Sequence, residues 1–183
     1  YENERLTFNE TYKRASELAM LMVEKYHIQP GERVAISMRN YPEWILAFMA
    51  TTSIGAIAVA MNALWQPDEM AYGLNDSGAK LLFADAERMQ RLAEVRDQVA
   101  IETIAVRTAG DAHSVALDDL LQELRASGRP IAMPTQAPQP EDDATLLYTS
   151  GSTGHPKGVA SSGERGDRNR VINKGRRIIP LGG

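Results

Sequence analysis

The sequence contains no cysteine, and this absence excludes several kinds of chemistry. Without thiols the chain has no disulfides, no thiolate metal sites and no cysteine nucleophile. Histidine is almost as scarce, since only His27, His113 and His155 occur, and their separation in the chain matches no ligand spacing of a zinc site. The sequence therefore predicts no metal ligands.

Long uninterrupted apolar runs are also absent. The longest run, residues 47–63, is broken by threonine, serine, glycine and asparagine, which makes it too polar and too short for a membrane span. The chain opens with YENERLTF, a polar stretch unlike the apolar core of a secretory signal. We therefore expect a cytoplasmic protein without a transmembrane segment.

What the sequence does contain is an alternation of short apolar runs with amphipathic stretches. Apolar runs of strand length occupy residues 34–37, 56–60, 80–84, 102–106 and 144–148. The stretches that precede or separate them carry apolar residues at helical spacing. Asn9 or Thr11 is the expected N-cap of the first helix, and Asp85 is that of the fourth. Strands that alternate with helices predict an α/β fold with a mainly parallel sheet flanked by helices.

The most informative stretch is residues 148–159, which read YTSGSTGHPKGV and follow the last predicted strand. Its glycines lack a Cβ, so the backbone can come close to a ligand. Its hydroxyl groups and amides offer hydrogen-bond donors, and Lys157 adds a positive charge. Such a loop suits a polyphosphate, whereas a flexible Gly/Ser linker would not need the Pro-Lys-Gly ending. A Walker phosphate loop is not expected, because there Lys and Ser or Thr directly follow the second glycine.

These residues closely resemble the Ser/Thr/Gly-rich phosphate loop of the adenylate-forming superfamily, which includes acyl-CoA synthetases, coumarate ligases, luciferases and peptide-synthetase adenylation domains. The likeness continues upstream, through the sequence PGERV at residues 30–34, the asparagine before the second helix, and the Gly-Ala to Asn step within residues 55–62. It covers roughly residues 5–162. Within the superfamily, the sequence is more similar to fatty or aryl acyl-CoA ligases than to peptide-synthetase domains.

The resemblance implies a truncated N-terminal part of the large domain of an adenylate-forming enzyme. Such enzymes use ATP and Mg²⁺ to convert a carboxylic acid, here a fatty or aryl acid, into an acyl-adenylate and pyrophosphate, and coenzyme A then displaces AMP. By the same resemblance, the residues that bind the β- and γ-phosphates of ATP would be Thr149, Ser150, Gly151, Ser152, Thr153, Gly154, Lys157 and Gly158.

The likeness ends soon after Val159. The family's motifs for adenine, ribose and magnesium, its hinge and its C-terminal lysine would lie further along a longer chain, so the resemblance implies no catalytic residue here. We therefore expect the N-terminal fragment of an ATP-dependent acyl-CoA synthetase, inactive alone. The alternative is a non-catalytic truncated fragment or pseudogene product that binds only phosphate or a partner, or that self-associates through exposed apolar surface.

Residues 163–183 differ in composition from the rest of the chain. They hold six Lys and Arg residues and two Asp and Glu residues, which gives the segment a net charge of +4. Because the whole chain has a net charge of −4, residues 1–162 have a net charge of −8. We expect two units, the family portion at 1–162 and a divergent, basic, disordered tail at 163–183. A shifted reading frame or misjoined gene end would explain the abrupt change, and an ordinary solvated terminus is the alternative. Specific nucleic-acid binding is not expected, because the tail lacks aromatic residues for stacking.

Overall fold

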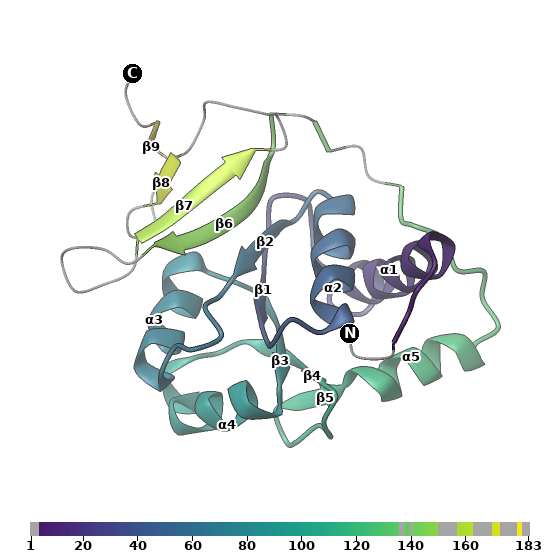
Figure 1. Cartoon of the computed structure of the whole chain (residues 1–183), viewed down its shortest axis with the longest axis horizontal. Coiled ribbons are helices and arrows are strands. Elements are labelled where there is room, and N and C mark those ends of the chain that lie inside the picture. Colours follow the sequence, from purple (N-terminus) through teal and green to yellow (C-terminus); the bar gives the residue numbers. More distant parts are fainter. Residues whose placement is uncertain are drawn as a thin grey trace.

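The computed structural model describes residues 4–135, 138–139, 141–149, 157–162, 170–172 and 179–180 (Figure 1). Within them the α-helices are α1 (Phe8–Glu24), α2 (Pro42–Ser53), α3 (Pro67–Ser77), α4 (Ala86–Glu94) and α5 (Leu117–Ala126). The strands are β1 (Arg33–Ser37), β2 (Ile57–Ala60), β3 (Leu81–Asp85), β4 (Glu102–Val106), β5 (Ser114–Ala116), β6 (Asp143–Thr149), β7 (Lys157–Ser162), β8 (Arg170–Ile172) and β9 (Ile179–Pro180). A short 3₁₀ turn, Arg96–Gln98, follows α4.

The described strands form one sheet in the order β5-β4-β3-β1-β2-β6-β7-β8-β9. Neighbouring strands from β5 to β6 run parallel. Those from β6 to β9 run antiparallel. The predicted mainly parallel α/β sheet is therefore confirmed. Strand β5 was not predicted, because its three residues are too few to show a period-two pattern.

The end of the chain differs from the expected arrangement, in which the phosphate loop follows the last strand. After the loop, Lys157–Ser162 returns along β6 as the antiparallel strand β7. Within the basic tail, which was expected to be disordered, the described residues form β8 and β9, and β8 pairs with β7. Backbone groups at the edge of β7 favour this pairing, since an unpaired strand edge is a template for another strand. The unit boundary at residue 162 stays a prediction.

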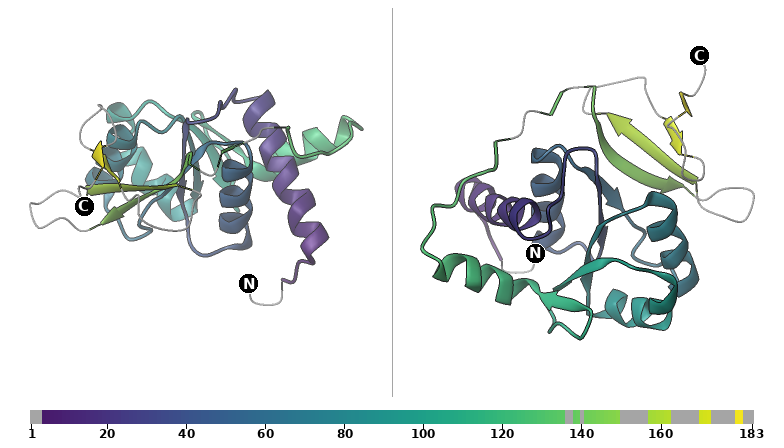
Figure 2. Two further views of the ribbon diagram at one scale, coloured as in Figure 1. Left: turned by 90° about the horizontal axis from the view of Figure 1, so that it is seen from above. Right: turned by 180° about the vertical axis from the view of Figure 1, so that it is seen from behind.

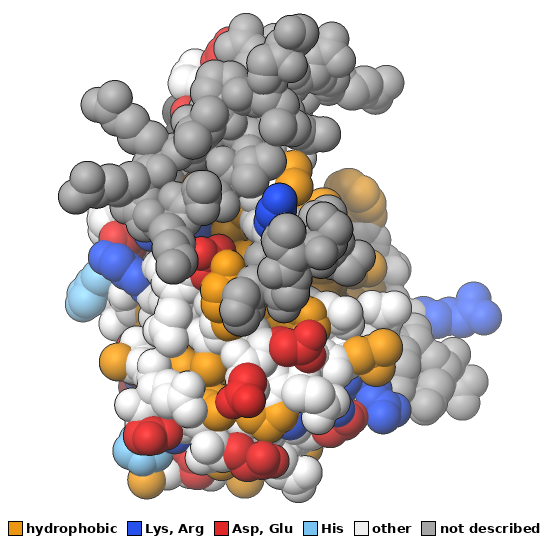
Figure 3. Space-filling view, turned by 90° about the vertical axis from the view of Figure 1, so that its left-hand side faces the viewer, with side chains coloured by type: hydrophobic (Ala, Val, Ile, Leu, Met, Phe, Trp, Pro, Cys, Tyr) orange, Lys and Arg blue, Asp and Glu red, His pale blue; other side chains and the backbone are white. Residues whose placement is uncertain are grey.

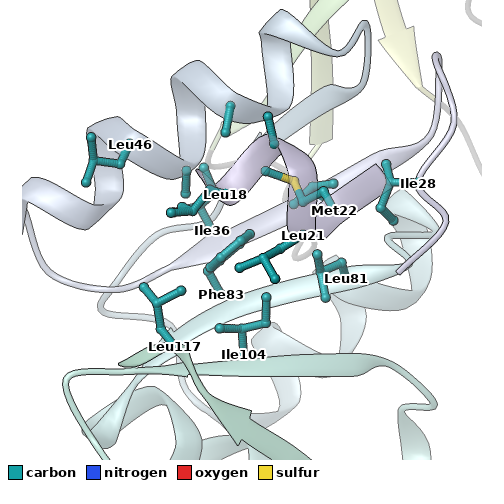
Figure 4. Packing of buried hydrophobic residues seen from close by; sticks show 14 of the residues in the cluster. Leu18, Leu21, Met22, Ile28, Ile36, Leu46, Leu81, Phe83, Ile104 and Leu117 are labelled. Atoms are coloured by element: carbon teal, nitrogen blue, oxygen red, sulfur yellow. The ribbon is translucent and has the colours of Figure 1, made fainter. Parts of the chain in front are cut away.

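Helices cover both faces of the parallel part of the sheet (Figure 2). On one face lie α1, α2 and α5, and the labelled side chains in Figure 4 show Leu18, Leu46 and Leu117 packing around Ile36 and Phe83. On the other face lie α3 and α4, with a second buried cluster that includes Met70, Leu92, Val59, Leu82 and Leu146. Because successive strand residues face opposite sides, strands covered on both faces are apolar throughout, which is why their runs were recognisable in the sequence.

The first helix begins earlier than expected. Neither Asn9 nor Thr11 is its N-cap; Thr7 is, and its side chain accepts a hydrogen bond from the Glu10 amide at 3.2 Å. The Glu10 carboxylate in turn accepts from the Thr7 amide at 2.7 Å, and this bond is the main reason that the pKa of Glu10 is lowered. Such a reciprocal capping box outcompetes a single cap within the helix. The predicted cap Asp85 is confirmed, since it accepts from the Arg88 amide at 3.1 Å.

Among the helices of the described part of the chain, none combines the length and the apolar character that crossing a membrane requires. The apolar run at residues 47–63, which the sequence suggested was too polar for a span, divides into the second half of α2 and strand β2.

Candidate functional site

The carboxyl edge of the parallel strands is where the predicted phosphate loop begins. Strand β6 pairs in parallel with β2, so Thr149 and Ala60 end at the same edge of the sheet. Ser150, Gly151, Ser152, Thr153 and Gly154, which the sequence assigned to phosphate binding, lie outside the described residues. The structure therefore defines the base of the loop, formed by Thr149, Lys157 and their neighbours, rather than its tip.

Strands β6 and β7 form an antiparallel stem beneath the loop. Thr149 is paired with Lys157, and Tyr148 is paired with Gly158. The pairing brings together three of the eight predicted phosphate-binding residues: Thr149, Lys157 and Gly158. Lys157 is exposed at this position. The loop thus starts and ends on two adjacent hydrogen-bonded strands, so the positions of its ends are set by the sheet.

Gly158 is buried, and packing explains why it is a glycine. A Cβ at this position would lie 3.1 Å from Cδ1 of Leu146 and 3.4 Å from two atoms of the Tyr148 ring. The sequence suggested a ligand-binding role for Gly158. The described geometry gives it a role in the stem, where it leaves room for the Tyr148 ring.

Tyr148 links the stem to two other elements. Its hydroxyl donates to Oδ2 of Asp76, in the last turn of α3, at 2.9 Å and lies 3.3 Å from the carbonyl oxygen of Gly73. Its ring meets the Trp65 ring edge to face, with the centroids 5.4 Å apart. Burial, followed by the nearby charge of Asp76, raises the pKa of Tyr148, so the hydroxyl remains a hydrogen-bond donor at neutral pH.

The segment after β2, residues 61–66, is held at the same edge by two arginines of α4. Arg88 Nε and Arg91 Nη1 each donate to the carbonyl oxygen of Ala63 at 2.9 Å, and Arg91 Nη1 also donates to that of Trp65 at 2.8 Å. Arg88 is buried and pairs with buried Asp85 at 3.2 Å. These contacts fix the backbone at Ala63 and Trp65, and so they fix the position of the Trp65 side chain.

Sequence reasoning missed this supporting network. It placed Tyr148 at the end of a strand and assigned no functional role to Asp76 or to Trp65, which is buried. No short-range pattern could have joined them, because Tyr148 and Asp76 are 72 positions apart. The described part of the chain holds no group of three or more acidic or histidine side chains placed to bind a metal ion.

A family model described as AMP-binding enzyme matches residues 1–165. The chain is 36% identical over 133 residues to a 3-hydroxybenzoate–CoA ligase from Aromatoleum sp. (strain CIB), a match that covers 72% of this chain and 24% of the relative. It is 34% identical over 159 residues to a 2-succinylbenzoate–CoA ligase from Bacillus velezensis, with 87% and 29% covered.

Solved structures show the same fold. An anthranilate CoA ligase in complex with anthranoyl-AMP matches with a TM-score of 0.80 at 23% identity, over 88% of this chain and 30% of that one. A fatty acyl CoA synthetase from Mycobacterium tuberculosis matches with a TM-score of 0.71 at 26% identity, again over 88% and 30%. The chain thus spans less than a third of the length of these relatives. With the family model matching most of its residues, the chain belongs to the AMP-binding enzyme family.

Proposed function

We propose that this chain is the N-terminal part of an ATP-dependent acyl- or aryl-CoA ligase. The residues proposed to bind the β- and γ-phosphates of ATP are Thr149, Ser150, Gly151, Ser152, Thr153, Gly154, Lys157 and Gly158. The observation that carries the proposal is the β6–β7 stem, which holds both ends of the loop at the carboxyl edge of a parallel sheet. Ligands of open α/β sheets bind at this edge. The names of the relatives support a fatty or aryl acid as substrate and coenzyme A as co-substrate.

The residues of the loop have the chemistry that a polyphosphate requires. Lys157 supplies a positive charge at the base of the loop, and the hydroxyls and amides of residues 149–154 would donate to phosphate oxygens. When bound, ATP supplies the phosphoanhydride whose cleavage activates the carboxylic acid. The chain's own part is to bind and orient the phosphates, with Mg²⁺ as their proposed counterion. We place this activity in the cytoplasm.

Acidic side chains on the surface around α3 and α4 make the positive charge of Lys157 important for binding a polyphosphate. Figure 3 shows the side of the molecule on which α3 and α4 lie, and acidic side chains are interspersed there with hydrophobic ones. An acidic surface repels a polyphosphate, so binding depends on the donors of the loop and on Lys157.

The proposal is tested by measuring binding of ATP with Mg²⁺ to the chain by calorimetry. We expect Lys157→Ala to weaken binding by about tenfold or more, since a charge-assisted contact to phosphate contributes about 1.5–3 kcal/mol. The matched control is Lys25→Ala, which removes an exposed lysine that pairs with Glu123 on another part of the molecule. Equal affinities of the wild type and the Lys157 variant, or no binding by the wild type, would contradict the proposal.

ATP–pyrophosphate exchange measures whether the chain also catalyses formation of an acyl-adenylate. We expect the chain alone not to form acyl-adenylate with a panel of fatty and aryl acids, because it spans less than a third of the relatives' length. Exchange well above that of the Lys157→Ala variant would show that the chain is a complete catalyst.

The second candidate function is that of a non-catalytic chain that associates with itself or binds only phosphate. One observation favours self-association: Leu147 of β6 is 48% exposed, although it lies in the middle of a strand. Exposed apolar side chains on a sheet favour contact with another apolar surface.

A further inference from the structure

Tyr148 is the next-to-last residue of β6 and directly precedes Thr149, the last residue of the stem before the loop. Its neighbour Thr149 pairs with Lys157, and Tyr148 itself pairs with Gly158. Any displacement of Tyr148 across the sheet is therefore passed directly to both ends of the loop at residues 150–156.

The Tyr148 ring is held from three sides. The Trp65 ring meets it edge to face on the segment after β2, and Gly158 leaves room for it on β7. On the third side its hydroxyl donates to the Asp76 carboxylate at 2.9 Å. A hydrogen bond to a charged acceptor in a partly buried position is stronger and more directional than one between neutral groups.

The hydroxyl is not needed to fill space. A phenylalanine at residue 148 would keep the contact with Trp65 and the fit against Gly158, and it would lose only the bonds of the hydroxyl to Asp76 and to the Gly73 carbonyl oxygen. Both acceptors belong to α3, which begins at Pro67, shortly after the segment held by Arg88 and Arg91. The hydroxyl therefore orients the stem with respect to α3.

We propose that Tyr148 and Asp76 are positioning residues for phosphate binding: their hydrogen bond sets the orientation of the β6–β7 stem and, with it, the position of Lys157. This inference rests on the proposed function and deepens it, because neither residue would touch the ligand. It gives α3 the role of holding the β6–β7 stem in the orientation that phosphate binding requires.

The test uses the complete chain, with inorganic tripolyphosphate and ATP as probes. We expect Tyr148→Phe and Asp76→Ala each to weaken both probes by about tenfold. The double variant should be no weaker than Tyr148→Phe, because Asp76→Ala removes a bond that Tyr148→Phe has already removed. Tyr12→Phe and Asp68→Ala are matched controls, since Tyr12 is an exposed residue of α1 and Asp68 lies at the opposite end of α3.

A second readout separates positioning from simple core packing. Hydrogen exchange of the amides of Thr149, Lys157 and Gly158 should speed up in Tyr148→Phe, while that of Ile36 in β1 stays unchanged. A side chain that merely fills the core would leave both the exchange at the stem and the affinity unaltered in the phenylalanine variant.

The outcomes distinguish the two proposals. If the wild type binds tripolyphosphate and the Tyr148 variant binds it equally well, or if the two single losses add in the double variant, the positioning role is overturned and the proposed function stands. If the wild type binds neither probe, the proposed function is overturned, and the positioning role with it. Coupled losses of affinity together with faster exchange at the stem support both.

Discussion

At the scale of single residues, Gly73 shows how a missing side chain shapes the surroundings of the site. It lies in the interior of α3, where glycine is less favourable than alanine by about 0.5–1 kcal/mol. A Cβ at this position would overlap the ring of Trp65. The Gly73 carbonyl oxygen also lies 3.3 Å from the Tyr148 hydroxyl. Close packing of α3 against Trp65 therefore outweighs helix propensity here.

We expect Gly73→Ala to lower the free energy of unfolding by about 1–3 kcal/mol, because the added methyl group must displace the Trp65 ring. Urea denaturation measures the change. Helix propensity alone predicts the opposite sign, which makes the result decisive. In a Trp65→Leu background the same substitution should cost less, since the smaller side chain leaves room. A Gly73→Ala chain more stable than the wild type would contradict this packing argument.

At the scale of elements, an ion pair joins two helices that are distant in the sequence. Glu17 of α1 is 1% exposed, and its carboxylate accepts from Nε and Nη2 of Arg125 of α5 at 2.8 and 2.7 Å. This carboxylate also raises the pKa of Arg125. Nearby, Arg129 and Glu24 form a similar two-bond pair, but both of their side chains are about half exposed. The two pairs differ chiefly in the burial of the acid.

We expect Arg125→Met to lower the free energy of unfolding by about 1–3 kcal/mol, since it leaves a buried carboxylate without its guanidinium. Its matched control, Arg129→Met, should change stability by less than about 1 kcal/mol, because water solvates Glu24 when its partner is removed. Thermal or urea unfolding of both variants tests the contrast. Similar effects of the two substitutions would mean that the burial of Glu17 does not set the strength of the α1–α5 contact.

At the scale of the whole molecule, the sheet is covered unevenly. Helices pack against both faces from β3 to β2, and the hairpin of β6 and β7 extends beyond them (Figures 1 and 2). Leu146 and Leu147 are adjacent in β6, yet Leu146 is buried while Leu147 is 48% exposed. Because successive strand residues point to opposite faces, one face of the hairpin packs against the core and the other retains an apolar surface.

We expect the chain to self-associate with rising concentration, and Leu147→Lys to reduce this association by placing a charge on the exposed face of β6. Sedimentation velocity over a range of concentrations measures the effect. Phe8→Lys is the control, because Phe8 is also exposed but lies at the start of α1. A wild-type chain that stays monomeric at all concentrations would refute the expectation, as would equal effects of the two lysine substitutions.

Much of the architecture could be predicted from local pattern. Strands covered on both faces are apolar throughout, so the runs at residues 34–37, 56–60 and 80–84 were recognisable. Asp85 was recognisable as a helix cap because the chemistry of a cap is local. Thr7 was missed because two alternative caps, Asn9 and Thr11, stood close by, and only the reciprocal bonds with Glu10 decide between them.

The sequence by itself determined the family and the α/β alternation, because these depend on the order of neighbouring residues. For the same reason it predicts the phosphate-binding chemistry of the loop that follows β6. The tertiary structure alone decided that β7 returns beside β6, that Gly158 accommodates Tyr148, and that Asp76 accepts a hydrogen bond from Tyr148. The physical reason is distance along the chain: Asp76 and Tyr148 are 72 positions apart, and they come together only because β6 joins the sheet beside β2, where its Tyr148 side chain reaches the last turn of α3.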